Sequence, residues 1–367
     1  MNEFQSCGFS FKSERQTLVA LFIAKKVNTM STSPTSTPTM QALVLASHHG
    51  ALTPTWLPRP QPDAGQVLVR IHASGVNPLD TKIHAGAAEH AQQPLPAILG
   101  MDLAGVVEEV GHGVSRFQVG DEVYGFTGGI GGLQGSLAQY AAVDARLIAR
   151  KPANVTMREA AALPLIFITA WEGLVDRAKV GSGHKVLVHG GAGGVGHVAV
   201  QLARARGADV FATGTAAQAA YIRSIGATPI DYETTSVEAY VNAFTEGKGF
   251  DIVYDTVGGP VLDASFLAVR RYSGHVVTSL GWGTHKLAPL SFRGATFSGV
   301  FTLLPILTGQ FREHHGEIME QATALAEAGQ LKPLLDPTTF TLDTADKAHA
   351  LLADGCARGK VVVSVLA

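Results

Sequence analysis

Three glycines are the residues of this chain best suited by type and spacing to hold a ligand. Gly191, Gly193 and Gly196 stand in the stretch "HGGAGGVGHVAVQLARARGADVFATGT" in the order G-x-G-x-x-G. The first glycine of such a run allows a tight turn, and the second lets the backbone approach a pyrophosphate. The third allows a helix and a strand to pack closely, and the helix N-terminus then offers N–H groups to the anion. Because the chain has 41 glycines, the motif needs support from its surroundings.

The sequence on both sides of the loop supplies that support. Lys185 to His189 is an apolar stretch that predicts a strand, and residues 197–206 predict a helix that Gly207 closes. The next strand ends in "ATGT", where an NAD-binding unit would place a carboxylate for the ribose 2′-OH. Asp209 lies at the start of that strand, so we interpret it as a solvated turn residue. Since no carboxylate would repel a 2′-phosphate, electrostatics favour NADP(H) as the cofactor.

The elements around the loop change in character along the chain. Short alternating apolar runs broken by Gly and Pro extend from residue 41 to about 144 and predict an irregular β-rich region. A helix-like segment follows over residues 157–178, and strand, turn and helix then alternate, which predicts a parallel sheet with crossover helices. The expected strands are "KVLVHG", "DVFATG", "FDIVYDTV" and "HVVTSLG". A long helix over "EIMEQATALAEAGQ" and a last strand in "GKVVVSVL" complete the pattern, and we expect that strand to return to the first domain.

These elements predict an α/β fold of two domains. Residues 41–164, completed by residues 304–367, form the β-rich domain, and residues 165–303 form a doubly wound parallel sheet of the Rossmann type. Residues 1–40 give no strand signal and end in a Ser/Thr/Pro-rich stretch, so we expect a flexible N-terminal extension. A later start at Met30 or Met40 and a mitochondrial presequence are the alternatives for this segment.

The composition narrows the class of partner. A formal net charge of −2 provides no basic stripe for nucleic acid, and no apolar run reaches the roughly 18 residues of a membrane span. The two cysteines, Cys7 and Cys356, exclude a disulfide framework and a four-cysteine zinc site. We therefore expect a cytoplasmic protein that acts on a small molecule and binds neither nucleic acid nor membrane.

Several separate stretches together resemble a known family. They are "ASGVNPLDTKIHAG", "LGMDLAGVVEEVG", "VGDEVYG", "LPLIFITAWEGLV", "VLVHGGAGGVG", "FDIVYDTVGG" and "RGKVVV". From about Gln41 to Ala367 the chain resembles the medium-chain dehydrogenase/reductase superfamily, in its zinc-free quinone oxidoreductase (zeta-crystallin-like) branch. The resemblance implies a GroES-like β domain built from both chain ends, an inserted Rossmann domain and a cofactor cleft between them.

The resemblance also locates the positions that hold catalytic zinc in metal-dependent relatives. These positions carry Asn77, Met101 and Leu165 here. None of the three residue types forms a usable ligand shell for zinc, and the nearby Asp102 alone would be a poor substitute. The histidine pairs His48/His49 and His314/His315 lie in polar, loop-like stretches without a spaced third ligand, so we expect surface histidines and no metal site.

By resemblance, the cofactor lies along one set of loops. Thr169 is expected near the nicotinamide, Gly214 at the adenosine ribose and Tyr232 beside the 2′-phosphate. Many relatives carry a lysine for the 2′-phosphate where this chain has Gln218, which reduces the expected preference for NADPH. The full predicted cofactor set is Thr169, Gly191, Gly193, Gly194, Val195, Gly196, Gly214, Gln218, Tyr232, Val257, Gly258, Leu280, Gly281 and Lys360.

The predicted catalytic residues are few. Asn77 and Asp80 match the "N-P-x-D" stretch that lines the cleft in relatives, and Lys82 stands where some quinone reductases have a tyrosine. Lys82 as a solvated lysine at the rim is the alternative reading. No histidine–carboxylate or serine–histidine pair in the sequence indicates a general acid. We therefore expect the cofactor to supply the reactive group while the protein orients the reactants.

The predicted function is zinc-independent, NADPH-dependent hydride transfer to a quinone or an α,β-unsaturated carbonyl. One alternative is a zinc-free alcohol dehydrogenase acting on simple carbonyls, and another is a non-catalytic NADPH-binding protein. The stretch from Gly294 to Leu303, "GATFSGVFTL", alternates β-forming residues and predicts an exposed sheet edge. We therefore expect a homodimer joined through this edge, in agreement with the resemblance.

Overall fold

The computed structural model describes residues 38–366, which form three β-sheets with flanking helices. The predicted extension 1–40 lies outside the described residues up to position 37, and strand β1 begins at Thr39. The helices are α2 (Pro78–His84), α3 (Met157–Ala161), α4 (Pro164–Trp171), α5 (Gly194–Ala205), α6 (Ala219–Ser224), α7 (Val237–Thr245), α8 (Pro260–Ala268), α9 (Ala288–Ser291), α10 (Leu304–Thr308), α11 (Arg312–Glu327) and α12 (Ala345–Ala353). Within residues 38–366, no helix combines the length and the apolar character that crossing a membrane requires.

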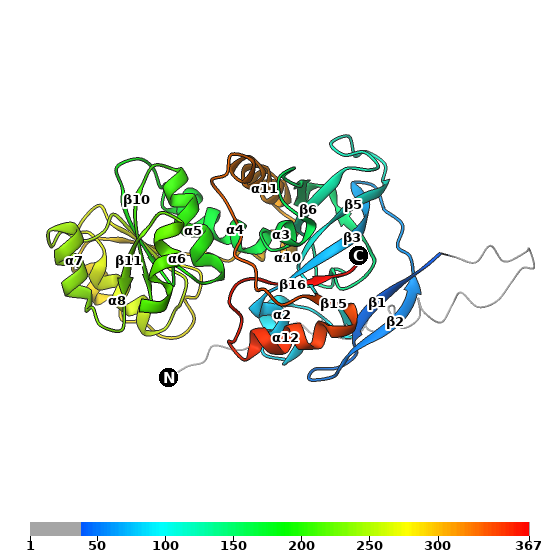
Figure 1. Cartoon of the computed structure of the whole chain (residues 1–367), viewed down its shortest axis with the longest axis horizontal. Helices are drawn as coiled ribbons and strands as arrows, with labels where there is room; N and C mark the ends of the chain where they lie inside the picture. Colours follow the sequence, from blue (N-terminus) through cyan, green and yellow to red (C-terminus); the bar gives the residue numbers. More distant parts are fainter. Residues whose placement is uncertain (1–37, 367) are drawn as a thin grey trace, which may run out of the picture. The chain divides into compact units, whose positions relative to one another are not determined.

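Two antiparallel-rich sheets contain both ends of the described chain. One has the order β2 (Leu52–Pro58), β1 (Thr39–Leu45), β4 (Ala97–Ile98). The other has the order β15 (Phe340–Thr341), β16 (Val361–Ser364), β3 (Gln66–Val76), β5 (Asp102–Val110), β6 (Glu122–Phe126), β8 (Ile148–Arg150), and β7 (Tyr140–Asp144) also pairs with β3. Figure 1 shows β16, the last strand, beside the early strand β3, and Val361 pairs with Val76. The predicted return of the last strand to the first domain is therefore confirmed.

The third sheet is parallel and has the order β11 (Thr228–Asp231), β10 (Asp209–Gly214), β9 (Lys185–His189), β12 (Ile252–Asp255), β13 (His275–Thr278), β14 (Thr296–Gly299). The four strands expected from the sequence, β9, β10, β12 and β13, are all present. This sheet draws its strands from residues 185–299, whereas the other two draw theirs from residues 39–150 and 340–364. The division agrees with an inserted Rossmann domain, although it does not determine the predicted bounds 41–164, 165–303 and 304–367.

Helices cover both faces of the parallel sheet because its central strands are apolar on both sides. In β9, the side chains of Val186 and Val188 pack in the cluster that includes α5, whereas Leu187 packs on the opposite face. There it meets residues of α7 and α8, among them Tyr240 and Phe266. Figure 1 shows α5 to α8 distributed around β10 and β11. This arrangement confirms the doubly wound α/β fold and explains the near-continuous apolar runs of its strands.

The segment predicted as one helix over residues 157–178 is divided in the structure, so that prediction was wrong in its continuity. Helix α3 ends at Ala161, α4 starts anew at Pro164, and a π-helical segment runs from Glu172 to Arg177. Pro164 has no N–H to donate to the preceding turn, and its fixed φ suits the first residue of a helix. The segment is helical over most of its length, as predicted, but the proline decides where the second helix begins.

Candidate functional site

The carboxyl ends of the parallel strands lie level with one another. Asp255 at the end of β12 pairs with His189 of β9 and Thr278 of β13, and Gly214 of β10 pairs with Asp231 of β11. The loops that follow these strands therefore meet along one edge of the sheet. The chain runs outward from β9 through β10 to β11, then returns to place β12 on the other side of β9. This change of direction between β9 and β12 is where open α/β sheets bind dinucleotides.

The glycine loop follows β9 at this point, and its glycines meet two different requirements. A Cβ on Gly191 would lie 2.5 Å from the Cβ of Ala212, and a Cβ on Gly196 would lie 2.0 Å from the carbonyl oxygen of Gly190. These two positions therefore exclude any side chain. Gly194 is exposed and has only one atom within 4 Å of such a Cβ, so its surface is bare backbone facing solvent. In the described chain, no side chain caps the N-terminus of α5, which leaves its first N–H groups available to a pyrophosphate.

His197 holds the glycine loop from behind, a role that the sequence did not indicate. Its Nδ1 lies 2.9 Å from the carbonyl oxygen of Gly193, and its Nε2 lies 3.1 Å from the backbone nitrogen of Leu334. Since Leu334 donates to Nε2, Nδ1 carries the proton and donates to Gly193. Burial lowers the pKa of His197 to about 4, so the ring is neutral and its tautomer is set. One turn along, Gln201 bonds both backbone groups of Lys332.

Asp255 ties together the loops after β12 and β13. Its carboxylate accepts the backbone N–H groups of Val257 and Gly258, each at 3.0 Å, and the hydroxyl of Thr278 at 2.7 Å. The Thr278 hydroxyl oxygen in turn accepts the N–H of Leu280 at 3.1 Å. The four predicted residues Val257, Gly258, Leu280 and Gly281 thus lie on two loops that one buried carboxylate orders. The sequence analysis had not singled out Asp255.

Thr169 lies on the second turn of α4 and is nine-tenths buried. Its hydroxyl donates to the carbonyl oxygen of Leu165 at 2.6 Å and lies 3.0 Å from the hydroxyl of Thr302, just beyond β14. The Tyr254 hydroxyl of β12 donates to the carbonyl oxygen of Thr169 at 2.8 Å. These contacts place the end of α4 against the parallel sheet.

At the predicted adenosine end, Gly214 is buried and Tyr232 is 58% exposed. The Gln218 side chain turns back and accepts the N–H of Thr215 at 3.0 Å. The structure also places Asp231 at the end of β11, where it pairs in register with Gly214. This carboxylate on the neighbouring strand weakens the electrostatic preference for NADP(H) that the end of β10 alone predicts.

A buried polar cluster lies where three strands of the large antiparallel sheet begin or end. Asn77 follows the last residue of β3, Asp102 begins β5, and Lys360 immediately precedes β16. The Asn77 amide nitrogen donates to Asp102 at 2.9 Å, and the Lys360 ammonium donates to the Asn77 amide oxygen and to the Val76 carbonyl oxygen. The second Asp102 oxygen accepts the N–H of Leu165 at 2.9 Å, at the start of α4. By the resemblance, Asn77 and Leu165 stand at two of the three zinc-ligand positions of metal-dependent relatives, and Asp102 directly follows the third, Met101.

Burial dominates the electrostatics of this cluster. It raises the pKa of Asp102 to about 6, although Lys360, Asn77 and Leu165 favour its charged form. Burial also raises the pKa of Asp80 to about 7, against hydrogen bonds from the backbone N–H groups of Asn77 and Gly100. For Lys360, burial lowers the pKa while Asp102 and Asp80 oppose that change. The cluster thus has one lysine and two carboxyl groups, and burial disfavours the charged form of each.

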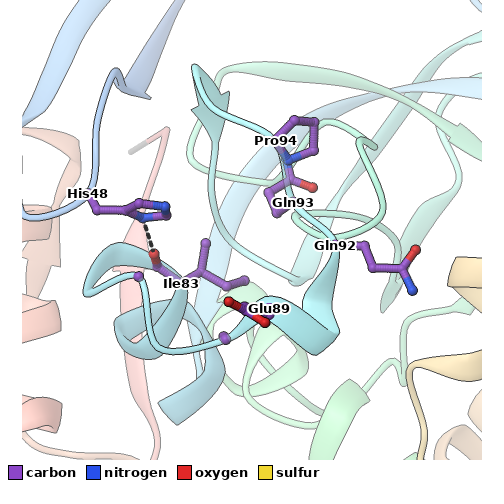
Figure 2. A pocket seen from close by; sticks show the side chains of 8 residues that line it. His48, Ile83, Glu89, Gln92, Gln93 and Pro94 are labelled. Atoms are coloured by element: carbon purple, nitrogen blue, oxygen red, sulfur yellow. Dashed lines mark hydrogen bonds between the residues drawn. The ribbon is translucent and has the colours of Figure 1, made fainter. Parts of the chain in front are cut away.

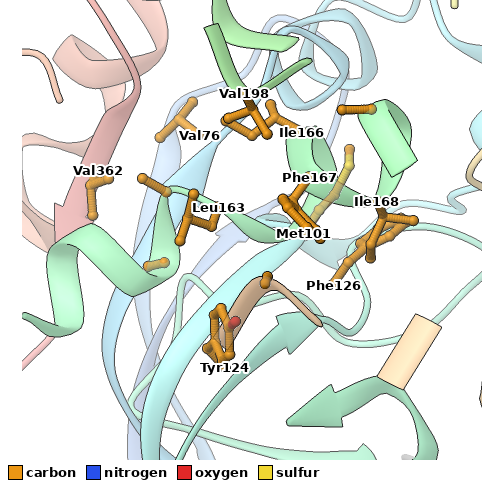
Figure 3. Close-up of a cluster of buried hydrophobic side chains, with 14 of the residues drawn as sticks. Val76, Met101, Tyr124, Phe126, Leu163, Ile166, Phe167, Ile168, Val198 and Val362 are labelled. Atoms are coloured by element: carbon orange, nitrogen blue, oxygen red, sulfur yellow. The ribbon is translucent and has the colours of Figure 1, made fainter. Parts of the chain in front are cut away.

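The cluster borders on an apolar interior. Met101 is fully buried, and Figure 3 shows it among Leu163, Phe167 and Ile168. Within residues 38–366, no three His, Cys, Asp or Glu side chains are grouped so that they could share a metal ion. The prediction of surface or loop histidines was wrong for His315, whereas the His314 side chain is 43% exposed. Both lie in α11, and His315 is fully buried with Nε2 at 3.3 Å from Glu172.

Lys82 is separate from the cluster. It is exposed on α2, two residues from the buried Asp80, and residues two apart on a helix do not share a face. Its side chain makes no hydrogen bond to another described residue. The structure therefore groups Asn77 and Asp80 with Lys360 and leaves Lys82 at the surface.

A surface cavity of about 490 Å³ lies elsewhere on the β-rich part, as Figure 2 shows. It is lined by His48, Ile83, Gly86, Ala88, Glu89, Gln92, Gln93 and Pro94. Among these, His48 bonds the Ile83 carbonyl oxygen through Nδ1 at 3.0 Å. None of the lining residues belongs to the glycine loop or the polar cluster, so we do not assign the reaction to this cavity.

Comparison with known proteins agrees with this geometry. Residues 63–153 match the family model described as the alcohol dehydrogenase GroES-like domain, and residues 225–363 match the model described as zinc-binding dehydrogenase. The chain is 37% identical over 306 residues to a 2-methylene-furan-3-one reductase of Solanum lycopersicum, covering 81% of this chain and 71% of that protein. It is 34% identical over 312 residues to an NADPH-dependent alkenal/one oxidoreductase of Arabidopsis thaliana, with 83% and 73% covered.

Solved structures show the same relationship. An alcohol dehydrogenase superfamily protein from Novosphingobium aromaticivorans is 59% identical with a TM-score of 0.87, and the match covers 89% of this chain and all of that one. The quinone oxidoreductase of Coxiella burnetii is 28% identical with a TM-score of 0.74, and covers 90% and 100%. The fold, the cofactor-binding edge and these similarities agree: this chain is an oxidoreductase of the medium-chain dehydrogenase/reductase superfamily and belongs to its zinc-free branch, with the quinone oxidoreductases and alkenal/one reductases.

Proposed function

We propose that this protein uses NADPH to reduce the conjugated double bond of an α,β-unsaturated carbonyl or a quinone. The observation that carries the proposal is the polar cluster of Asn77, Asp102 and Lys360. At the positions where metal-dependent relatives hold zinc, the chain has an amide, a thioether and an aliphatic side chain, and an ammonium lies beside them. Such a set of side chains lacks the ligands of a Lewis-acid metal and offers hydrogen-bonding groups instead.

The chain's own residues fit the proposed cofactor. The bare backbone of Gly193 and Gly194 and the uncapped N-terminus of α5 suit a pyrophosphate, and His197 keeps the loop in place behind them. The loops held by Asp255 would flank the nicotinamide, which supplies a hydride when bound. Thr169 would lie on the opposite side, because α4 runs from the polar cluster to the sheet. The remaining residues of the predicted cofactor set stay proposals on the same grounds.

A conjugated acceptor suits this site better than a simple carbonyl. When a saturated aldehyde accepts a hydride, negative charge develops on one oxygen, which a metal ion would stabilise directly. An enone or quinone spreads the same charge over its π-system, so an amide or a bound water can provide enough stabilisation. The candidate donors are a bound water and Asn77, whose amide donates one N–H to Asp102. Asn77 is 0% exposed in this structure, so its second N–H would reach an acceptor only after the site opens.

The test is NADPH oxidation against a panel of quinones, enals, enones and saturated aldehydes. We expect turnover of the conjugated acceptors, little turnover of saturated aldehydes, and no change on adding a chelator or zinc. Equal efficiency with saturated aldehydes or secondary alcohols would favour the zinc-free alcohol dehydrogenase instead. Cofactor binding without reduction of any acceptor would favour the non-catalytic NADPH-binding protein.

The proposal has three finer parts. The first is a preference for NADPH over NADH, the second is the homodimer, and the third is the cytoplasmic location. A named relative is NADPH-dependent, which supports the first. The exposed edge strand β14 supports the second. The two cysteines and the near-neutral charge favour a small-molecule enzyme of a reducing compartment, which is the basis for the third.

A further inference from the structure

We propose that His197 is a positioning residue for the cofactor: it joins the glycine loop to the segment 332–336, and that segment sets how tightly the loop binds the pyrophosphate. The segment lies between α11 and β15, outside the residues that form the parallel sheet. The inference rests on the proposed function, and it makes the affinity for NADPH depend on contacts far from the cofactor.

On the side of the loop, His197 fixes one carbonyl group. Its ring nitrogen Nδ1 and its backbone nitrogen lie 2.9 Å and 3.1 Å from the carbonyl oxygen of Gly193, and both donate to it. A trans peptide directs its C=O and its N–H to opposite sides. Fixing the Gly193 carbonyl therefore also fixes the N–H of Gly194, on the side where we expect the pyrophosphate.

On its other side, His197 contacts a segment that the antiparallel sheet holds. Its Nε2 accepts the N–H of Leu334 at 3.1 Å. The Leu334 carbonyl oxygen accepts the N–H of Lys360 at 2.7 Å, and the Lys360 carbonyl oxygen accepts the N–H of Asp336 at 3.0 Å. Lys360 directly precedes β16. One buried imidazole thus connects the glycine loop to the strand that returns to the β-rich part.

Two further contacts keep the segment in place. Gln201, one turn along α5, bonds the nitrogen and the carbonyl oxygen of Lys332 at 2.9 Å and 3.0 Å. Gly359 lies against the segment, because a Cβ there would be 2.6 Å from the Leu334 carbonyl oxygen and 3.0 Å from the Asp336 nitrogen. A side chain at position 359 would push the segment away from the start of β16. It would do so without touching the glycine loop.

The experiment compares two ligands that differ in the pyrophosphate. NADPH and 2′-AMP share the adenosine and the 2′-phosphate, but 2′-AMP has no pyrophosphate. In Gly359→Ala we expect the NADPH Kd to rise about 3-fold to 10-fold, as for the loss of one hydrogen bond, while the Kd for 2′-AMP stays unchanged. His197→Asn should have the same effect, because its shorter amide can donate to Gly193 but cannot reach Leu334.

Gly181→Ala is the matched control, because a Cβ at Gly181 has no atom within 4 Å. Both dissociation constants should stay at their wild-type values in this variant. Hydrogen exchange over residues 189–199 provides a second measurement, on the cofactor-free protein. We expect faster exchange in Gly359→Ala and in His197→Asn, and wild-type exchange in Gly181→Ala.

An equal loss of affinity for NADPH and 2′-AMP would assign His197 and Gly359 a general structural role and overturn the inference. An unchanged NADPH Kd in His197→Asn would overturn it as well, and this variant decides the question if Gly359→Ala does not fold. A wild-type protein that binds no NADPH would refute the proposed function itself, a result that is visible before any variant is made.

Discussion

The Asp80 carboxyl group is held by two backbone N–H groups, at 2.8 Å from Asn77 and 3.1 Å from Gly100, yet it is fully buried. Burial raises its pKa from 3.8 to about 7. A pKa raised by folding means that the stability contributed by this group is fully present below about pH 4 and is lost as the pH rises through 7. Asp80 therefore lowers the free energy of unfolding across that range.

Because the pKa of Asp80 is raised by folding, the pH dependence of stability should change in Asp80→Asn. In the variant, one side-chain oxygen that accepts a backbone N–H is lost at every pH. The asparagine side chain, unlike the carboxyl group, does not titrate. We expect it to be less stable than the wild type at pH 5, with the difference in unfolding free energy shrinking toward pH 8. Urea unfolding at several pH values measures it, and the other carboxylates cancel in the comparison. A difference that grows with pH would show that folding lowers the pKa of Asp80.

Cofactor preference is also a property of single residues. The side-chain oxygen of Gln218 already accepts the Thr215 N–H, and Asp231 adds a carboxylate on the next strand. Gln218→Lys should add a charge-assisted contact to a 2′-phosphate, worth about 1.5 to 3 kcal/mol if well formed and less where solvent screens it. We expect kcat/KM to shift toward NADPH over NADH.

Asp231→Asn is the companion variant, and it should shift the preference in the same direction by removing a negative charge. If neither substitution changes the ratio of kcat/KM values, the 2′-phosphate does not lie between these two residues.

At the scale of the element, the start of α5 combines two glycines with opposite requirements. A methyl group on Gly196 would lie 2.0 Å from the Gly190 carbonyl oxygen, whereas one on Gly194 would meet only Ile166, at 4.0 Å. We expect Gly196→Ala to displace the loop, lower the melting temperature and abolish NADPH binding.

Gly194→Ala is the matched control. Alanine in the first turn of a helix should keep or raise stability, by about 0.4 to 1 kcal/mol, while its methyl group weakens NADPH binding from the exposed side of the loop. Thermal unfolding and NADPH titration separate the two effects. Equal melting temperatures for both variants would contradict the packing argument.

At the scale of the whole molecule, β14 is an edge strand with one unpaired side among the described residues. Thr296 and Val300 donate their N–H groups toward β13, at Gly274 and Thr278, so the N–H groups of Phe297 and Gly299 point away from the sheet. Phe297 and Phe301 are 38% and 37% exposed. An exposed edge strand with outward N–H groups can pair with a second copy, although β14 has only four residues.

Sedimentation at micromolar concentration should therefore give a mass near twice 38.4 kDa. Gly299→Pro removes an outward N–H without removing a bond to β13, and it should shift the equilibrium toward monomer. Gly299→Ala, which has free space around its methyl group, should remain a dimer. A wild-type monomer at this concentration would refute the proposed assembly.

The sequence by itself determined the fold class and the cofactor loop, because both depend on short-range patterns. Apolar strands with glycine at their ends alternate with helices, and these local preferences agree with the tertiary fold. The glycine spacing identified the turn after β9 because backbone contacts, such as that between Gly196 and Gly190, allow no other residue.

Only the tertiary structure decided which polar groups share a site. Asn77, Asp102 and Lys360 are distant in sequence and meet because β3, β5 and β16 are neighbours in one sheet. Lys82 lies two residues beyond the N-P-x-D motif that contains Asp80, yet the turn of α2 leaves it at the surface. Strand pairing and burial set these contacts and the pKa shifts that follow, and neither quantity can be read from the spacing of residues along a chain.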